Sequence, residues 1–156
     1  MAVDLHSIYE QGFDVKKLGP SQKKEFSRNR LTTFSPALAI ILHFITLGIF
    51  TWIYYGIQHG RLPRVHPGDF GAGKAIGFSF IPFFNIYWMF IFWLRLVDRV
   101  NFQAKLRNKQ PRIEKGLMLA TLIVGLIPYV GAFSFLILYP VCIGIIQSAI
   151  NELARS

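Results

Sequence analysis

Side chains that could bind a metal ion occur together at one place in the sequence, the loop that holds His59, His66 and Asp69. A protein zinc site takes three or four convergent ligands at short, recognisable spacings. Two histidines seven positions apart and one aspartate, on a stretch rich in glycine and proline, do not match that pattern. The sequence therefore predicts a solvated loop here, with no metal and no cofactor.

Catalytic side chains are sparse in the rest of the chain. Asp98 lies between Arg95 and Arg99 and is expected to pair with one of them at the surface. Cys142 stands among apolar residues, whereas reactive thiolates need electropositive, accessible surroundings. The serines and threonines have no recognisable neighbouring base, and the glycines of the loop lack the flanks of a phosphate-binding motif. We therefore expect no enzymatic activity.

Three polar side chains fall inside long apolar stretches and form a possible intramembrane polar site: His43, Asn85 and Gln147. An ionisable group within an apolar segment is a functional candidate. The alternative for His43 is structural, with a neutral ring that donates to a backbone carbonyl at a helix break. Gln147 and Asn151 share one helical face, where they either hydrogen-bond a neighbouring helix or are solvated at the helix end.

Composition points to a membrane protein. Of the 156 residues, 53% are apolar and 16% are charged, against about 25% charged in an average soluble domain. The 17 lysines and arginines outnumber the 8 aspartates and glutamates, for a net charge of +9. This hydrophobicity excludes a disordered chain and is untypical of a nucleic-acid-binding module, and a single cysteine cannot form a disulfide within the chain. The class that remains is a small integral membrane protein.

Charged residues are absent from three long runs, residues 31–60, 75–94 and 116–151. About 20 helical residues cross a hydrocarbon core, so each run is long enough to enter the bilayer. We expect a membrane domain over residues 31–156 that contains all three runs.

Basic residues gather in two segments, an N-terminal arm at residues 1–30 and the stretch 95–115. Basic segments beside membrane helices stay in the cytoplasm and attract anionic headgroups. The predicted lipid contacts are Lys16, Lys17, Lys23, Lys24, Arg28, Arg30, Arg95, Arg99, Lys105, Arg107, Lys109, Arg112 and Lys115.

Each apolar run contains a similar phrase near its centre: Phe44–Trp52, Phe80–Trp88 and Leu126–Ser134. The shared order is an apolar residue, isoleucine, threonine or proline, two further residues, then glycine or asparagine, with the glycine one place early in the first copy. Proline removes a backbone donor, while glycine and asparagine tolerate left-handed backbone, so each run is predicted to break. The predicted break residues are Thr46, Gly48, Pro82, Asn85, Pro128 and Gly131, with Asn85 capping a helix that starts at Ile86.

Two all-α membrane architectures remain open. In one, each run is a helical hairpin that enters and leaves on the same side, giving three repeated hairpins. In the other, the first two runs cross once and the third crosses twice, giving four transmembrane helices. A single span would place Asn85 and Trp88 near the bilayer centre, which favours hairpins. Both architectures leave the N- and C-termini in the cytoplasm.

The second phrase, Phe-Ile-Pro-Phe-Phe-Asn-Ile-Tyr-Trp over Phe80–Trp88 with Asp98–Asn101 beyond it, resembles a widespread group of small bacterial membrane proteins. The first phrase, Ile-Thr-Leu-Gly-Ile over Ile45–Ile49, resembles a related group with the motif Ile-Thr-x-Gly-Ile-Tyr. The resemblance covers about residues 34–152 and implies a protein of the bacterial cytoplasmic membrane. Because both groups are domains of unknown function, the resemblance implies no activity.

These observations predict a non-enzymatic membrane protein that acts as a scaffold, a membrane-shaping element or an accessory subunit of a membrane complex. We expect anionic lipids as partners and no nucleic acid. Irregular backbone at membrane depth must be covered by protein, so a second copy or a larger membrane protein is also expected. The alternative is a component of a transporter or channel for a small solute or ion, because broken helices in repeated segments are common in transporters.

Overall fold

The structure, a computed structural model, describes residues 14–111 and 113–156, so Arg112 lies outside the described residues. Within these two ranges the chain contains helices and no strand, which confirms the all-α prediction. The helices are η1 (Val15–Lys17), α2 (Pro20–Ser27), α3 (Pro36–Ile45), α4 (Ile49–Arg61), α5 (Ala72–Ser79), α6 (Phe84–Leu106), α7 (Lys115–Leu126), α8 (Gly131–Phe133), the π-helical η2 (Ser134–Leu138) and α9 (Tyr139–Ala154).

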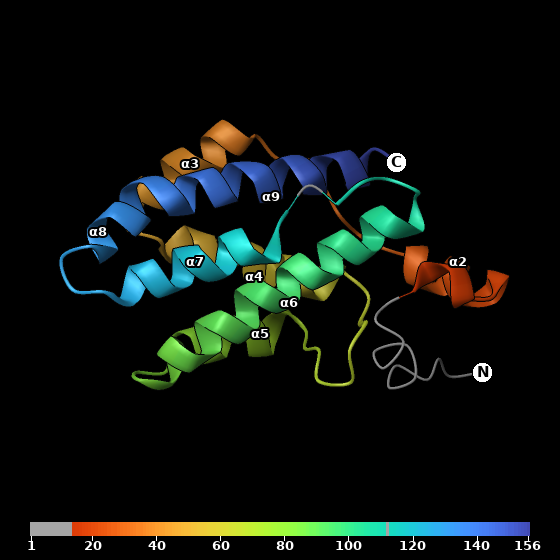
Figure 1. Cartoon of the computed structure of the whole chain (residues 1–156), viewed down its shortest axis with the longest axis horizontal. Coiled ribbons are helices and arrows are strands. Elements are labelled where there is room, and N and C mark those ends of the chain that lie inside the picture. The colour runs from red at the N-terminus through yellow and green to blue at the C-terminus, as the bar shows by residue number, and fades with distance from the viewer. Residues whose placement is uncertain (1–13, 112) are drawn as a thin grey trace.

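Helices that follow one another along each apolar run pack side by side. α3 contacts α4, α5 contacts α6, and α7 contacts the helix formed by α8, η2 and α9. The three short turns that join them are residues 46–48, 80–83 and 127–130, and we call the end of the molecule where they lie the turn end. Figure 1 shows this end at the left, with α2 and the C-terminus at the right. Each apolar run is therefore two helical arms joined by a short turn.

The main core lies where α6 meets α4, α7 and α9. Phe92, Trp93 and Leu96 of α6 are fully buried there, together with Ile143 and Ile146 of α9. The first hairpin is joined to the third because α3 packs along α9. The hairpins thus form one packed unit.

α8, η2 and α9 form one continuous helix, Gly131–Ala154, of 24 residues. Among the described residues it is the one helix long and apolar enough to cross a membrane. The apolar helices Pro36–Ile45 and Lys115–Leu126 are shorter.

The described part of the N-terminal arm packs against the end of α6 that lies away from the turn end. Phe26 of α2 meets Phe102 edge to face, with ring centroids 5.4 Å apart. The amide of Gln103 donates to the Phe26 carbonyl, and Leu18 and Val65 complete this second apolar cluster. The basic arm is therefore docked on the helical unit from residue 14 onward.

Candidate functional site: the turn end and its charged collar

The second and third hairpins close with the same backbone hydrogen bonds. A γ-turn spans Pro82–Phe84, with 2.7 Å between the amide nitrogen and the carbonyl oxygen, and an equivalent one spans Pro128–Val130 at 2.8 Å. In both hairpins the carbonyl of the preceding isoleucine accepts from the residue four positions on, over 2.9 Å and 2.8 Å. The repeat in the sequence is therefore a repeat in backbone geometry.

The first hairpin reaches a similar turn by different contacts. The Thr46 hydroxyl donates to the Leu42 carbonyl over 2.7 Å and accepts from the Phe50 amide over 2.9 Å. Gly48 has φ of 89°, a left-handed conformation that favours glycine. The Thr46 side chain thus restrains the backbone of the first turn through hydrogen bonds. In the other two copies the proline ring restrains the backbone at the same position.

One position of the turn is unusual in all three copies. Leu47, Phe83 and Tyr129 stand fourth in the three phrases, with φ of 51°, 61° and 66°. Left-handed backbone costs an L-residue about 1–2 kcal/mol, yet here it carries large apolar side chains. Their exposed fractions are 79%, 88% and 100%. Sequence analysis missed these residues, although the repeat places each one directly after the threonine or proline of its break.

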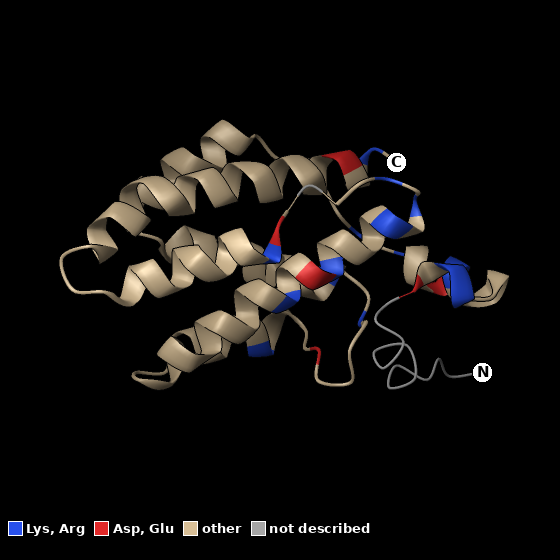
Figure 2. Ribbon diagram, in the orientation of Figure 1, with Lys and Arg blue, Asp and Glu red and all other residues tan. Residues whose placement is uncertain are grey.

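The turn end carries no charged residue. Figure 2 shows the lysines, arginines and acidic residues confined to the other parts of the molecule. Large apolar side chains are exposed along the flanking helices as well, among them Leu38, Ile41, Ile45, Ile49, Ile53, Leu119, Ile123, Leu126, Leu136 and Ile137. The exposed apolar surface therefore continues from the turn end along the flanking helices. We call the turn end and these exposed helical residues together the apolar belt.

Of the predicted break residues, Gly131 has a clear packing role and Asn85 does not have the predicted capping role. A Cβ on Gly131 would lie 2.6 Å from the Gly125 carbonyl oxygen, so this glycine allows the arms of the third hairpin to approach closely. The prediction that Asn85 caps a helix starting at Ile86 is wrong. α6 begins at Phe84, no side-chain cap hydrogen bond forms there, and Asn85 is exposed.

The three residues of the predicted polar site are not brought together. The His43 ring nitrogen Nδ1 lies 2.8 Å from the Thr51 hydroxyl, and the ring packs against Phe135, with centroids 4.5 Å apart. Gln147 is buried elsewhere in the core, where its amide oxygen accepts from the Tyr55 hydroxyl over 3.3 Å. His43 and Gln147 therefore join hairpins one and three, and Asn85 lies apart at the turn end.

Of the two residues that share a helical face, Gln147 hydrogen-bonds the neighbouring helix α4 through Tyr55, and Asn151 binds the segment before α3. The Asn151 side chain accepts from the Phe34 amide over 2.9 Å, donates to the Phe34 carbonyl over 2.7 Å and accepts from Gln147 over 2.9 Å. This pairing satisfies the backbone immediately before α3.

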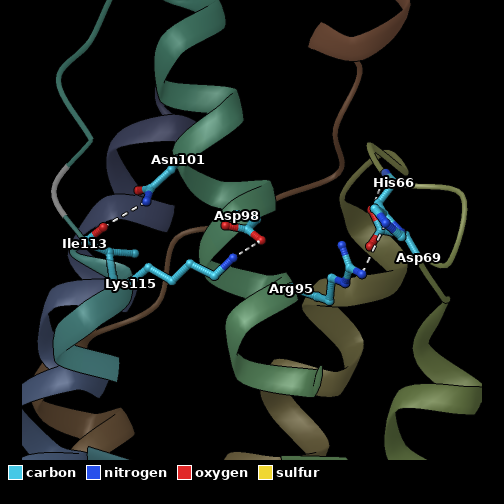
Figure 3. A network of polar contacts seen from close by, with 7 residues as sticks. All are labelled: His66, Asp69, Arg95, Asp98, Asn101, Ile113 and Lys115. Atoms are coloured by element: carbon cyan, nitrogen blue, oxygen red, sulfur yellow. Dashed lines mark hydrogen bonds and ion pairs between the residues drawn. The ribbon is translucent and has the colours of Figure 1, made fainter. Parts of the chain in front are cut away.

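Charged and polar side chains lie on two sides of α6, and Figure 3 shows them. We call this group the collar: His66, Asp69, Arg95, Asp98, Asn101 and Lys115. On one side Arg95 points toward His66, with 3.3 Å between guanidinium and ring nitrogen. On the other side Lys115 pairs with Asp98 at 2.8 Å. The predicted pairing of Asp98 with Arg95 or Arg99 is therefore replaced by a contact from the start of α7.

The loop predicted to be solvated is partly packed. Val65, Asp69 and Phe70 are buried, and the Asp69 carboxylate accepts from the amides of Val65 and His66, each over 2.8 Å. His59 is also buried, with Nε2 3.1 Å from the Phe92 carbonyl. Among the residues that the structure describes, no three His, Cys, Asp or Glu side chains lie close enough to hold a metal ion.

Arg99 is the centre of this loop and not a lipid contact. Its side chain is 1% exposed, so the prediction that it meets headgroups is wrong. The guanidinium donates to the carbonyls of His59, Leu62, Pro63 and Phe70 and to His59 Nδ1. Burial lowers the pKa of Arg99 to about 10, which leaves it protonated at neutral pH. Nothing in the sequence distinguishes it from Arg95, one helical turn earlier.

The other predicted lipid contacts lie outside the apolar belt. Arg95, Arg107 and Lys109 are half-buried, and Lys109 pairs with Glu152 at 3.3 Å. The exposed ones are Lys16, Lys17, Lys23, Lys24, Arg28, Arg30, Lys105 and Lys115. Cations thus gather on the side of the molecule away from the turn end.

Comparison of the chain with models of protein families, with curated proteins and with solved structures gives no match.

Proposed function

We propose that this protein is a non-enzymatic membrane scaffold that inserts its turn end into the cytoplasmic leaflet and deforms it. The observation that carries the proposal is the set of three strained, exposed apolar residues, Leu47, Phe83 and Tyr129, at equivalent places of one uncharged end. In water such a surface is unfavourable, because each large apolar side chain gains about 1.5–3 kcal/mol on transfer to an apolar phase. A bilayer is the apolar phase that fits a belt of this extent.

Helix length supports insertion to about half the membrane. At 1.5 Å per residue, the 10 residues of α3 rise about 15 Å and the 13 residues of α4 about 20 Å. One leaflet of hydrocarbon is about 15 Å thick. A hairpin of this length brings the first turn near the midplane. The second arm of the third hairpin, Gly131–Ala154, is longer and must lie tilted if it also stays within one leaflet.

A wedge follows from this depth. In the hairpin architecture the helical arms occupy more area in one leaflet than in the other, which curves the membrane. The exposed lysines and arginines favour a leaflet rich in anionic lipid, at about 1 kcal/mol for each basic residue near the surface. A second copy or a larger membrane protein packed against the belt would extend the scaffold.

The topology test uses single cysteines in a Cys142→Ser background. We place them at Leu47, Phe83 and Tyr129, and at Arg64 in the loop after α4, and add membrane-impermeant maleimide from either side of the membrane. The three turn positions should resist labelling from both sides, and a fluorophore attached there should be quenched by lipids labelled deep in the bilayer. Arg64 should react from the cytoplasmic side alone. Labelling of the turn positions from the side opposite the cytoplasm would refute the hairpin architecture and support four transmembrane helices.

The shaping test measures vesicle size after reconstitution. Wild-type protein should reduce the diameter of anionic vesicles, and the triple variant Leu47→Ser, Phe83→Ser, Tyr129→Ser should lose most of this effect. Ile57→Ser, at the far end of α4, removes an exposed apolar side chain elsewhere and serves as the control. Equal vesicle sizes with wild type and the triple variant would refute the wedge.

The transporter or channel alternative and the resemblance to small bacterial membrane proteins stay predictions from the sequence. Several buried polar side chains that a solute path would use contact one another, as in His43 with Thr51 and Tyr55 with Gln147. This pairing supports a packing role for them and therefore favours the scaffold.

A further inference from the structure

A basic groove of about 660 Å³ lies on the side of the molecule opposite the turn end. One wall is the start of the described chain, η1 and α2, and the other is the end of α6 with the residues that follow it. The side chains that matter are Lys16 and Lys23 on the first wall and Lys105 and Lys109 on the second. A volume of this order is typical of small-molecule sites, which span about 300–1,000 Å³.

The charge of the groove is poorly compensated. Among the described residues of the lining, Asp14 is the one carboxylate, and its oxygen accepts from the Lys16 amide. Lys109 has Glu152 as a partner, but within the described ranges Lys16, Lys23 and Lys105 form no ion pair. Like charges that converge on one cleft repel one another and raise the local concentration of anions. The groove is therefore poised for a negative ligand.

The two walls are held together by contacts beneath the groove. The Arg107 guanidinium donates to the Gln103 amide oxygen over 2.6 Å and to the Ser27 carbonyl over 3.3 Å. The packing of Phe26 on Phe102 lies next to these bonds. These contacts hold α2 against α6 in the absence of a ligand. An anion therefore binds lysines that are already on facing walls of the groove.

We propose that this groove binds a phosphate-bearing anion with at least two negative charges. Ammonium groups are compact point charges that bind phosphate oxygens, and several of them together favour an anion with more than one negative charge. Three unpaired lysines are matched by a diphosphate or by two neighbouring phosphates. The source is a lipid headgroup with two phosphates or a soluble diphosphate. This site is separate from the turn end, so it does not rest on the proposed membrane insertion.

The test is a calorimetric titration of the full chain in neutral detergent with inorganic pyrophosphate. At 0.15 M salt the Debye length is about 8 Å, so distant charges contribute little. The pair Lys16→Gln, Lys23→Gln removes two groove lysines. The pair Lys17→Gln, Lys24→Gln removes their sequence neighbours, which do not line the groove, with the same change in net charge. We expect at least a tenfold loss of affinity in the first pair and less than a twofold loss in the second.

Two further arms distinguish the sources. Vesicles with a two-phosphate lipid, compared at equal total charge with vesicles of a one-phosphate lipid, should bind wild type more tightly if the headgroup is the ligand. Equal binding to both vesicles together with tight pyrophosphate binding identifies the soluble anion. Equal losses in the two lysine pairs, or no pyrophosphate binding at millimolar concentration, would overturn the site. The labelling of turn cysteines is unaffected by either result.

Discussion

The sharpest test of the packing described above is Arg99→Leu. The substitution shortens the side chain and removes all the donors that Arg99 sends to the end of α4 and the loop after it. Four backbone carbonyls and one ring nitrogen lose their partner at once. These acceptors belong to residues 59, 62, 63 and 70, so Arg99 joins both ends of the loop to α6.

The magnitude follows from two opposing effects. A hydrogen bond to a charged group contributes about 1.5–3 kcal/mol, so five of them would amount to about 7.5–15 kcal/mol, as much as the total stability of a domain. The sum overstates the loss, because removing the guanidinium also ends the cost of burying its charge and the loop relaxes toward water. Each acceptor that stays buried without a partner costs about 1–3 kcal/mol, so two of them would cost about 3–5 kcal/mol. We expect a loss in that range for Arg99→Leu, and about 2 kcal/mol for Arg99→Lys, whose ammonium has fewer donors.

Cys142 supplies the assay. It is the only cysteine of the chain and is buried in the core, so a maleimide dye reports unfolding in detergent as this thiol becomes accessible. Since 1 kcal/mol shifts Tm by about 2–4 °C at this chain length, Arg99→Leu should lower Tm by about 10 °C or more. Lys115→Leu also removes a cation, but from an exposed pair with Asp98, and should shift Tm by less than about 3 °C. An Arg99→Leu protein as stable as wild type would contradict this reasoning. It would show that the free energy of desolvating the guanidinium is as large as the stabilisation by its hydrogen bonds.

Three further substitutions have expected outcomes in the same assay. Gly131→Ala should cost about 2 kcal/mol or more because its Cβ would meet the Gly125 carbonyl, while Gly116→Ala, in open space, should cost nothing; equal effects would contradict the close approach. Gln58→Leu should add about 1 kcal/mol, since neither amide atom of this buried side chain makes a well-formed hydrogen bond among the described residues, and a lower Tm would show that the nearby Tyr54 hydroxyl binds it. Asn85→Leu should change stability by less than about 0.5 kcal/mol, and a loss above 1 kcal/mol would restore its role as a cap.

Local chemistry was enough to place the three turns. Proline at positions 82 and 128 and glycine at 48 restrict or release the backbone in ways that depend on neighbouring residues alone, and helices end beside them. The predicted cap at Asn85 is wrong because α6 starts at Phe84, two residues before the predicted start at Ile86. The start of α6 depends on the positive φ of Phe83, and helix propensity does not predict that conformation for phenylalanine.

Non-local contacts were beyond the reach of the sequence. Arg95 and Arg99 are the same residue type on one helix, and only the loop that folds over α6 makes the second one internal. Asp98 had two cations within reach along the chain, but its partner Lys115 comes from the next helix. Tertiary packing decided both cases, and neither pattern nor spacing carried that information.

The lack of charge in the three turns has a consequence for biogenesis. A chain whose hairpins fold back inside the bilayer never passes a hydrophilic loop through it. Moving a single lysine or aspartate to the bilayer centre costs about 2.5–3.5 kcal/mol on insertion scales, and hairpins of this kind avoid that expense entirely. If the proposed insertion holds, the protein enters its membrane from the side on which it is synthesised, with no dependence on machinery that translocates polar segments.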